Sequence, residues 1–204
     1  MAKVTGLHAF FIKERYMKIM AEKGYRFYDT EQAYNVNVIA VRSDVRTVNK
    51  YDDMLLVIYR NPTRDWEILS YPITTDPSAF YANKANSKGT AVLIPDQYQD
   101  AYKIVDDRFV QVSDKSVEIY REANKESLDD EQASAISQGH FGIDLDAPDA
   151  EVKIVDRWCA GNQLFKRSTD YNEFIRACKR AAKKFGNCFT YTLLTEGDVY
   201  DSDY

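Results

Sequence analysis

The chain has few of the residues that build disulfide frameworks or metal sites, and it has no long apolar segment. Its 204 residues include three cysteines, Cys159, Cys178 and Cys188, and no two of them have Cys-x-x-Cys spacing. So small and odd a number excludes a disulfide framework and favours a reducing compartment without a zinc site. No apolar run approaches the roughly 20 residues that cross a bilayer, and the first residues lack the apolar core of a secretory signal. We therefore expect no membrane span, no export by the chain's own sequence and no cofactor.

Aromatic and charged residues, in contrast, are plentiful. Aromatic side chains make up 13% of the chain, with 15 Tyr and 10 Phe, which favours β-sheet and adhesive surfaces. Lys and Arg number 27 against 32 Asp and Glu, so the formal net charge is −5. This is a globular composition, and the length suffices for one substantial core.

Charge is unevenly placed along the chain. Residues 122–156 carry ten acids and two bases, residues 157–187 carry eight bases and two acids, and residues 188–204 add four acids, so the three blocks have net charges of −8, +6 and −4. Blocks of alternating sign favour electrostatic pairing within or between subunits over nucleic-acid binding. We expect no direct nucleic-acid partner.

The pattern of apolar residues predicts a mainly β chain with a helix near each end. Residues 9–24 read as an amphipathic helix that ends at Gly24. Strands are predicted at residues 37–42, 54–59, 66–71, 90–95, 102–105, 116–120, 151–155 and 189–194. Turn residues 61–65 join two of these strands into a hairpin, and residues 122–138 are predicted to form a long surface loop.

A second helix is predicted over residues 169–185. Asp170 and Glu173 lie in its first turn, five bases load its second half, and Gly186 supplies the stop, as the helix dipole favours. Its buried stripe is predicted to be Phe174, Ile175, Cys178 and Ala182. Its basic face is either solvated or paired with the acidic tail of the same or a neighbouring subunit.

These elements define the expected organisation. We predict an α+β, mainly β fold in one domain spanning residues 1–204. It comprises an N-terminal helix over 9–24, a β-rich body over 36–194 and an acidic tail over 195–204.

The region from Gly139 to Phe165 holds the residues best suited to chemistry. A cysteine nucleophile needs a nearby base and gains from backbone N–H groups that stabilise an oxyanion. Cys159 and His140, with Ala160-Gly161 behind the thiol, meet that requirement by residue type. The alternative is that Cys159 is a small buried hydrophobe and His140 a turn residue.

Several ordered phrases resemble proteins encoded by phages and prophages of Bacteroides-type gut bacteria, including crAss-like phages. These phrases are residues 37–42, 52–59, 73–77, 88–93, 95–98 and 141–143, then Trp158-x-Ala160-Gly161-x-Gln163 and Gly186-Asn187-x-Phe189-Thr190-Tyr191-Thr192-Leu193. Those proteins in turn resemble L,D-transpeptidases, the cysteine enzymes that cross-link or trim peptidoglycan stem peptides. The resemblance covers most of the chain after the first helix and implies an L,D-transpeptidase-like β-sandwich or barrel.

The resemblance also implies that the catalytic pair is missing. In such relatives the Phe-Gly-Ile phrase leads into Asn-Ile-His, whose His is the base, and the Trp phrase reads Trp-Ser-Ala-Gly-Cys-Gln, whose Cys is the nucleophile. Carried over residue by residue, Asp146 holds the base position, Cys159 the Ser position and Asn162 the nucleophile position. An Asn amide cannot replace a thiol, and a carboxylate with an ordinary pKa is a weak base. We therefore expect a degenerate site and no enzyme activity, with Cys159 and His140 as the fallback pair.

A further remnant lies at residues 120–126. Relatives tend to have an Asp-x-Asn-x-Asp calcium loop there, and Glu122, Asn124 and Glu126 keep oxygen ligands in alternation. The Gly and the final bidentate Glu of a complete EF-hand loop are missing, so the prediction is a solvated acidic turn, with metal binding as the alternative.

Together, the sequence and the resemblance favour a virion structural protein of a tailed phage. We expect it in the tail or in a portal-proximal ring, made in the host cytoplasm, with other virion proteins and copies of itself as partners. The runner-up is a phage-encoded peptidoglycan-modifying Cys enzyme or a cell-wall binder. A third possibility is a cytoplasmic accessory protein.

Overall fold

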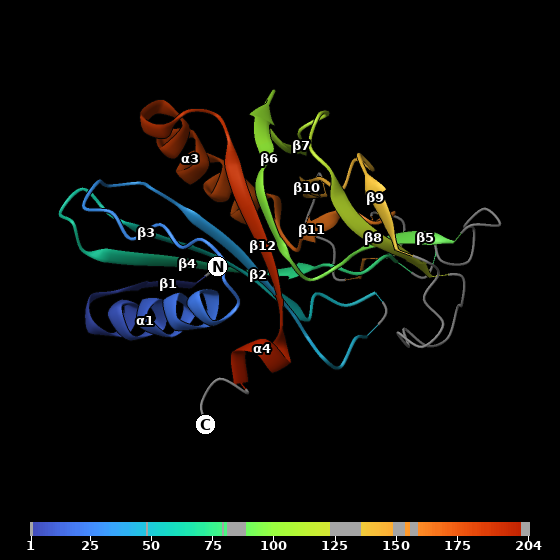
Figure 1. Cartoon of the computed structure of the whole chain (residues 1–204), viewed down its shortest axis with the longest axis horizontal. Helices are drawn as coiled ribbons and strands as arrows, with labels where there is room; N and C mark the ends of the chain where they lie inside the picture. Colours follow the sequence, from blue (N-terminus) through green and yellow to red (C-terminus); the bar gives the residue numbers. More distant parts are fainter. Residues whose placement is uncertain are drawn as a thin grey trace.

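The computed structural model of the chain describes residues 2–47, 49–78, 80, 89–122, 136–148, 154–155 and 159–200. Figure 1 shows the arrangement of its elements. The described helices are α1 (Gly6–Glu22), α3 (Ser168–Phe185) and α4 (Glu196–Tyr200). The described strands are β1 (Ala2–Thr5), β2 (Asn37–Arg42), β3 (Asp53–Arg60), β4 (Trp66–Thr74), β5 (Thr90–Leu93), β6 (Gln97–Val105), β7 (Arg108–Gln111), β8 (Val117–Glu122), β9 (Ser137–Gly139), β10 (Leu145–Asp146), β11 (Gln163–Phe165) and β12 (Phe189–Thr195).

Eight of the strands close into a barrel. Their order is β4-β11-β10-β7-β6-β12-β2-β3, and β3 pairs with β4 to complete the circle. The pairs β2–β12 and β10–β11 are parallel and the others antiparallel. β1 pairs with β4 outside the circle, and β5, β8 and β9 form a second sheet. The mainly β prediction is therefore confirmed at this level.

Strands β2, β3 and β4 are buried on both faces because a helix covers each side. Inward residues such as Val38 and Leu55 share one core with α3, while Ile39 and Leu56, their neighbours along each strand, share another with α1. In Figure 1 the three strands accordingly lie between the two helices. Burial on both sides explains why these strands are apolar runs without polar alternation.

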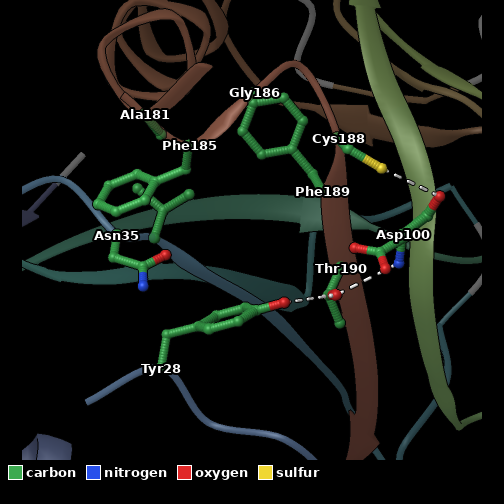
Figure 2. A pocket seen from close by; sticks show the side chains of 10 residues that line it. Tyr28, Asn35, Asp100, Ala181, Phe185, Gly186, Cys188, Phe189 and Thr190 are labelled. Atoms are coloured by element: carbon green, nitrogen blue, oxygen red, sulfur yellow. Dashed lines mark hydrogen bonds between the residues drawn. The ribbon is translucent and has the colours of Figure 1, made fainter. Parts of the chain in front are cut away.

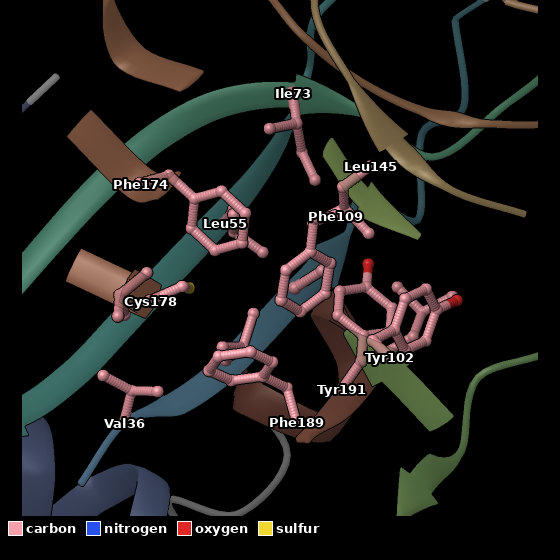
Figure 3. Packing of buried hydrophobic residues seen from close by; sticks show 14 of the residues in the cluster. Val36, Leu55, Ile73, Tyr102, Phe109, Leu145, Phe174, Cys178, Phe189 and Tyr191 are labelled. Carbon is pink, nitrogen blue, oxygen red and sulfur yellow. The ribbon is translucent and has the colours of Figure 1, made fainter. Parts of the chain in front are cut away.

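Aromatic rings fill the core between α3 and the barrel (Figure 3). The Phe109 ring stacks on Tyr102 at 5.3 Å between centroids and meets Phe174 of α3 edge-on at 5.0 Å. Cys178 is fully buried in the same cluster, whereas Ala182, predicted to be buried, is only partly so. The abundance of aromatic residues thus serves the core of the barrel.

Helix α1 begins earlier and faces differently from the prediction. It starts at Gly6, whose φ is +67°, and ends before Gly24, whose φ is +71°. Its buried face carries Ala9, Lys13, Tyr16, Ile19 and Met20. Phe10 and Phe11, although apolar, are 44% and 60% exposed. Lys13 is buried instead because its ammonium pairs with Asp29 at 2.9 Å and lies 5.0 Å from the Trp66 ring.

Most predicted strands are found with shifted ends, and the hairpin over residues 54–71 is confirmed. The strand predicted over residues 151–155 is wrong for residues 154–155, which are not in a strand, while 151–153 lie outside the described residues. Residues 123–135 of the predicted loop also lie outside them, and its end forms β9.

The predicted basic helix is confirmed as α3, and the tail contains α4. On α3, Lys179 pairs with Asp107, while Arg180 and Lys184 lie over the Tyr34 ring. In the described part of the tail, Asp198 pairs with Lys23 at 2.7 Å. Within one chain, therefore, these described tail residues pair with the end of α1 and not with the basic face of α3.

Candidate functional site

The positions that the resemblance assigns to catalysis meet at the parallel pair β10–β11. Leu145 lies opposite Gln163, and Asp146 lies opposite Leu164. Asn162 immediately precedes β11, and its side-chain oxygen accepts a 3.4 Å hydrogen bond from the Asp144 N–H. Asp146 and Asn162 thus lie on adjoining segments although they are 16 positions apart in the sequence, and Asn162 contacts Asp144, two residues before Asp146.

Both side chains are held by structural contacts. The Asp146 carboxylate accepts the Ala147 N–H at 2.9 Å and lies 3.6 Å from Arg108. Arg108 also lies 3.5 Å from Asp144, whose carboxylate accepts the Gln111 N–H. Burial raises the pKa of Asp144, an effect that this hydrogen bond and Arg108 oppose. The Asn162 amide, at the position assigned to the nucleophile, is not a nucleophile.

Cys159 is sealed inside the protein. Its side chain is 0% exposed, and its sulfur lies 3.1 Å from the Asp76 carbonyl and 2.9 Å from the Asn162 carbonyl. Burial raises the pKa of the thiol to about 12. Because only the thiolate is a strong nucleophile, this cysteine is inert near neutral pH.

The fallback pair is not brought together. His140 is exposed between β9 and β10, and its charge acts on Asp144. The hydrogen bonds of the buried Cys159 thiol go to Asp76 and Asn162 instead. No base in hydrogen-bond contact with Cys159 occurs in the described part of the chain.

The backbone donors around the site are also in use. The N–H groups of Phe141, Gly142 and Ile143 converge on the Gln111 side-chain oxygen at 3.1, 3.0 and 3.4 Å. Such a cluster of donors could otherwise stabilise an oxyanion. The Phe-Gly-Ile phrase is therefore a structural turn around an internal acceptor.

Next to Cys159 lies a buried ionic network that the sequence analysis missed. Arg46 donates to one oxygen of Asp76 through Nε at 2.9 Å and Nη2 at 2.5 Å. Arg42 donates to the Thr75 hydroxyl and to the Leu93 carbonyl, and Asp53 accepts from the Thr75 N–H and hydroxyl. Burial raises the pKa of Asp53, and the nearby Asp76 adds to this. Arg42, Asp53 and Asp76 lie in phrases that the resemblance singled out, whereas Arg46 lies in none of them.

This network ties the second sheet to the barrel. Arg42 ends β2 and reaches β5, while Arg46 reaches the Tyr120 hydroxyl on β8 at 2.8 Å. A cavity of about 300 Å³ lies at this junction, lined by Arg42, Ser43, Asp44, Arg46, Pro95, Tyr120 and Thr195. Both guanidinium groups make internal hydrogen bonds, so the network serves chiefly as a structural link.

The predicted metal remnant is largely outside the described residues. Asn124 and Glu126 lie there, and Glu122 is the last residue of β8. Elsewhere in the described part of the chain, no group of three potential ligands could hold a metal ion.

No protein family, curated protein or solved structure matches this chain. The resemblance to L,D-transpeptidases therefore stays a prediction. Among the described helices, none is both long and apolar enough to cross a membrane.

Proposed function

We propose that this chain is a virion structural protein of a tailed phage, in the tail or a portal-proximal ring, built on an inactivated L,D-transpeptidase-like domain. The observation that carries the proposal is that the residues at the assigned catalytic positions make structural contacts. Asn162 occupies the assigned nucleophile position and accepts a backbone hydrogen bond, and the nearby Cys159 thiol is fully buried. A retained scaffold whose reactive groups have become structural suits assembly better than catalysis.

Exposed apolar side chains support a role in assembly. Leu7, Phe10 and Phe11 are 68%, 44% and 60% exposed, and their spacing places them on one side of α1. Contiguous exposed apolar groups of this kind are typical of subunit contacts. The alternating charge blocks of the sequence favour the same role.

The proposal predicts that the protein is present in purified particles of the phage that encodes it, in a fixed ratio to the portal protein. Quantitative mass spectrometry of purified virions measures that ratio. Light scattering on a sizing column is expected to show self-association of the purified chain, because ring subunits contact copies of themselves. A strict monomer that is absent from particles would contradict the proposal.

A peptidoglycan assay separates the runner-up from the proposal. Purified sacculi treated with the protein are expected to keep their pattern of cross-linked stem peptides, for the wild type and for Cys159→Ala alike. A change in cross-links that Cys159→Ala abolishes would establish an enzyme instead.

A further inference from the structure

A small cavity lies at the C-terminal end of α3. Its volume is about 210 Å³, below the roughly 300 Å³ of the smallest common drug-sized sites. Figure 2 shows its walls, which come from α3, β12, β6 and the segment before β2. They are Tyr28, Asn35, Val36, Asp100, Ala181, Phe185, Gly186, Cys188, Phe189 and Thr190.

A bulge in β6 turns Asp100 toward this cavity. Phe189 pairs with Tyr102 and Tyr191 with Tyr98, so a two-residue step on β12 spans four residues of β6. At the bulge Asp100 has a φ of +54°, which is uncommon for any residue other than Gly. Figure 2 shows its side chain next to Cys188 and Thr190. Bulges and left-handed residues often occur where a strand aims a functional side chain.

Asp100 is the one charged residue among the described residues that line the cavity. No Lys or Arg in the described residues forms an ion pair with Asp100. Arg26, whose charge acts on Asp100, is exposed and is not part of the lining. The last turn of α3 ends at Gly186 on the cavity wall, and carbonyl groups at a helix C-terminus favour cations.

The remaining walls are suited to a short hydrocarbon chain with a hydrogen-bonding head. Val36, Phe185 and Phe189 provide apolar surface. The Asp100 N–H donates to the Thr190 hydroxyl at 3.3 Å, and that hydroxyl lies 3.1 Å from the Tyr28 hydroxyl. Where Tyr28 donates to Thr190, the Tyr28 oxygen keeps a lone pair that can accept an N–H of a ligand.

We propose that this cavity binds a primary alkylammonium group, with the cation at Asp100 and the hydrocarbon chain against Phe185 and Phe189. A free amine and a lysine side chain of another polypeptide share this chemistry. Binding in this cavity does not depend on the virion role or on the transpeptidase-like site, so the inference is independent of the proposed function.

The test is an NMR titration of the ¹⁵N-labelled full chain with n-butylammonium chloride. We expect saturable shifts of the Asp100, Cys188 and Thr190 amides, with a Kd on the order of 1–10 mM for so small a ligand. n-Butanol and butyrate have the same chain length without the positive charge and are expected to bind at least about tenfold more weakly. Equal binding of butanol, or no saturable shift of these amides, would overturn the proposal.

Three variants test which side chains the binding needs. Asp100→Asn is expected to weaken butylammonium binding about tenfold, and Asn tolerates a positive φ as Asp does. Asp106→Asn, at a φ of +47° in the next turn, makes the same change of charge outside the cavity and is expected to leave Kd unchanged. Tyr28→Phe is expected to weaken binding less than Asp100→Asn does. Unchanged binding by Asp100→Asn, or an equal loss in Asp106→Asn, would show that Asp100 is not the site.

The same titration with Nα-acetyl-lysine N-methylamide distinguishes the sources of the ammonium group. Binding comparable to that of butylammonium supports a lysine side chain as the ligand. Binding of butylammonium alone supports a free amine.

Discussion

Asp76→Ala is expected to lower the free energy of unfolding by about 3–5 kcal/mol, the usual cost of removing one partner of a buried ion pair. The Asp76 side chain is 4% exposed and its main partner Arg46 is 9% exposed. Without the carboxylate, the buried Arg46 guanidinium loses its 2.5 Å ion pair, and the buried Arg42 guanidinium loses an anion 3.7 Å away. In a chain of this size the midpoint of thermal unfolding is expected to fall by about 10 °C.

Urea denaturation of Asp76→Ala measures this loss. Asp114→Ala, at an exposed turn, removes the same side chain away from the network and is expected to change stability by less than about 0.5 kcal/mol. The double variant Asp76→Ala/Arg46→Met is expected to recover part of the loss, because it removes the buried cation closest to Asp76, while Arg42, 3.7 Å from Asp76 in the wild type, stays in place. A loss below about 1 kcal/mol in Asp76→Ala would contradict the structural role of the network.

Gly161→Ala is expected to destabilise the protein by about 3 kcal/mol, from backbone strain and overpacking together. The φ of Gly161 is +117°, and a Cβ atom there would lie 2.7 Å from the Ala91 carbonyl oxygen of β5. That oxygen belongs to the backbone of a paired strand, so it cannot move away cheaply. The turn that contains the assigned nucleophile position is therefore packed against the second sheet.

Gly142→Ala, in the neighbouring 141–143 turn, is the matched control for Gly161→Ala. Gly142 has a φ of +67°, but a Cβ there would meet nothing within 4 Å. Only the strain is then expected, about 1 kcal/mol. Urea unfolding of both variants separates the two contributions, and equal losses would show that the close approach to Ala91 has no energetic weight.

The local sequence pattern predicted those helices and strands for which intrinsic propensity and burial favour the same conformation. The helix α3 has acids in its first turn, bases in its last and Gly186 after it, so its limits were predicted within one residue. The apolar runs of β2 to β4 were found because these strands are buried on both faces. Propensity and tertiary burial favour the same conformation in these segments.

Other features depend on contacts between distant residues and leave little local signal. β1 has the exposed sequence Ala2–Thr5 and is a strand because it pairs with residues 67–70 of β4. On α1, Phe10 is exposed and Lys13 is buried, the reverse of the usual pattern for apolar and charged side chains. Lys13 is buried because its ammonium lies over the Trp66 ring and pairs with Asp29. The bonds of Arg42 and Arg46 join residues 30 to 74 positions apart.

The candidate site was partly predictable as well. The phrases around Asp146 and Asn162 were singled out from the sequence, and the parallel pair β10–β11 makes these two segments neighbours. The depth of Cys159 could not be predicted, because a cysteine suits a core and a reactive site equally well. Its burial by Val155, Leu164 and Tyr51 is a tertiary property.

Alkylation of the native protein by iodoacetamide, followed over time by peptide mass spectrometry, tests the central claim that the Cys159 region is structural. Cys188 is exposed, whereas Cys159 and Cys178 are buried with thiol pKa values raised by burial. We expect Cys188 to react first, and Cys159 and Cys178 to react only when denaturant unfolds the chain. Modification of Cys159 in the native protein as fast as that of Cys188 would show that the Cys159 region is open to reagents and not a sealed structural element.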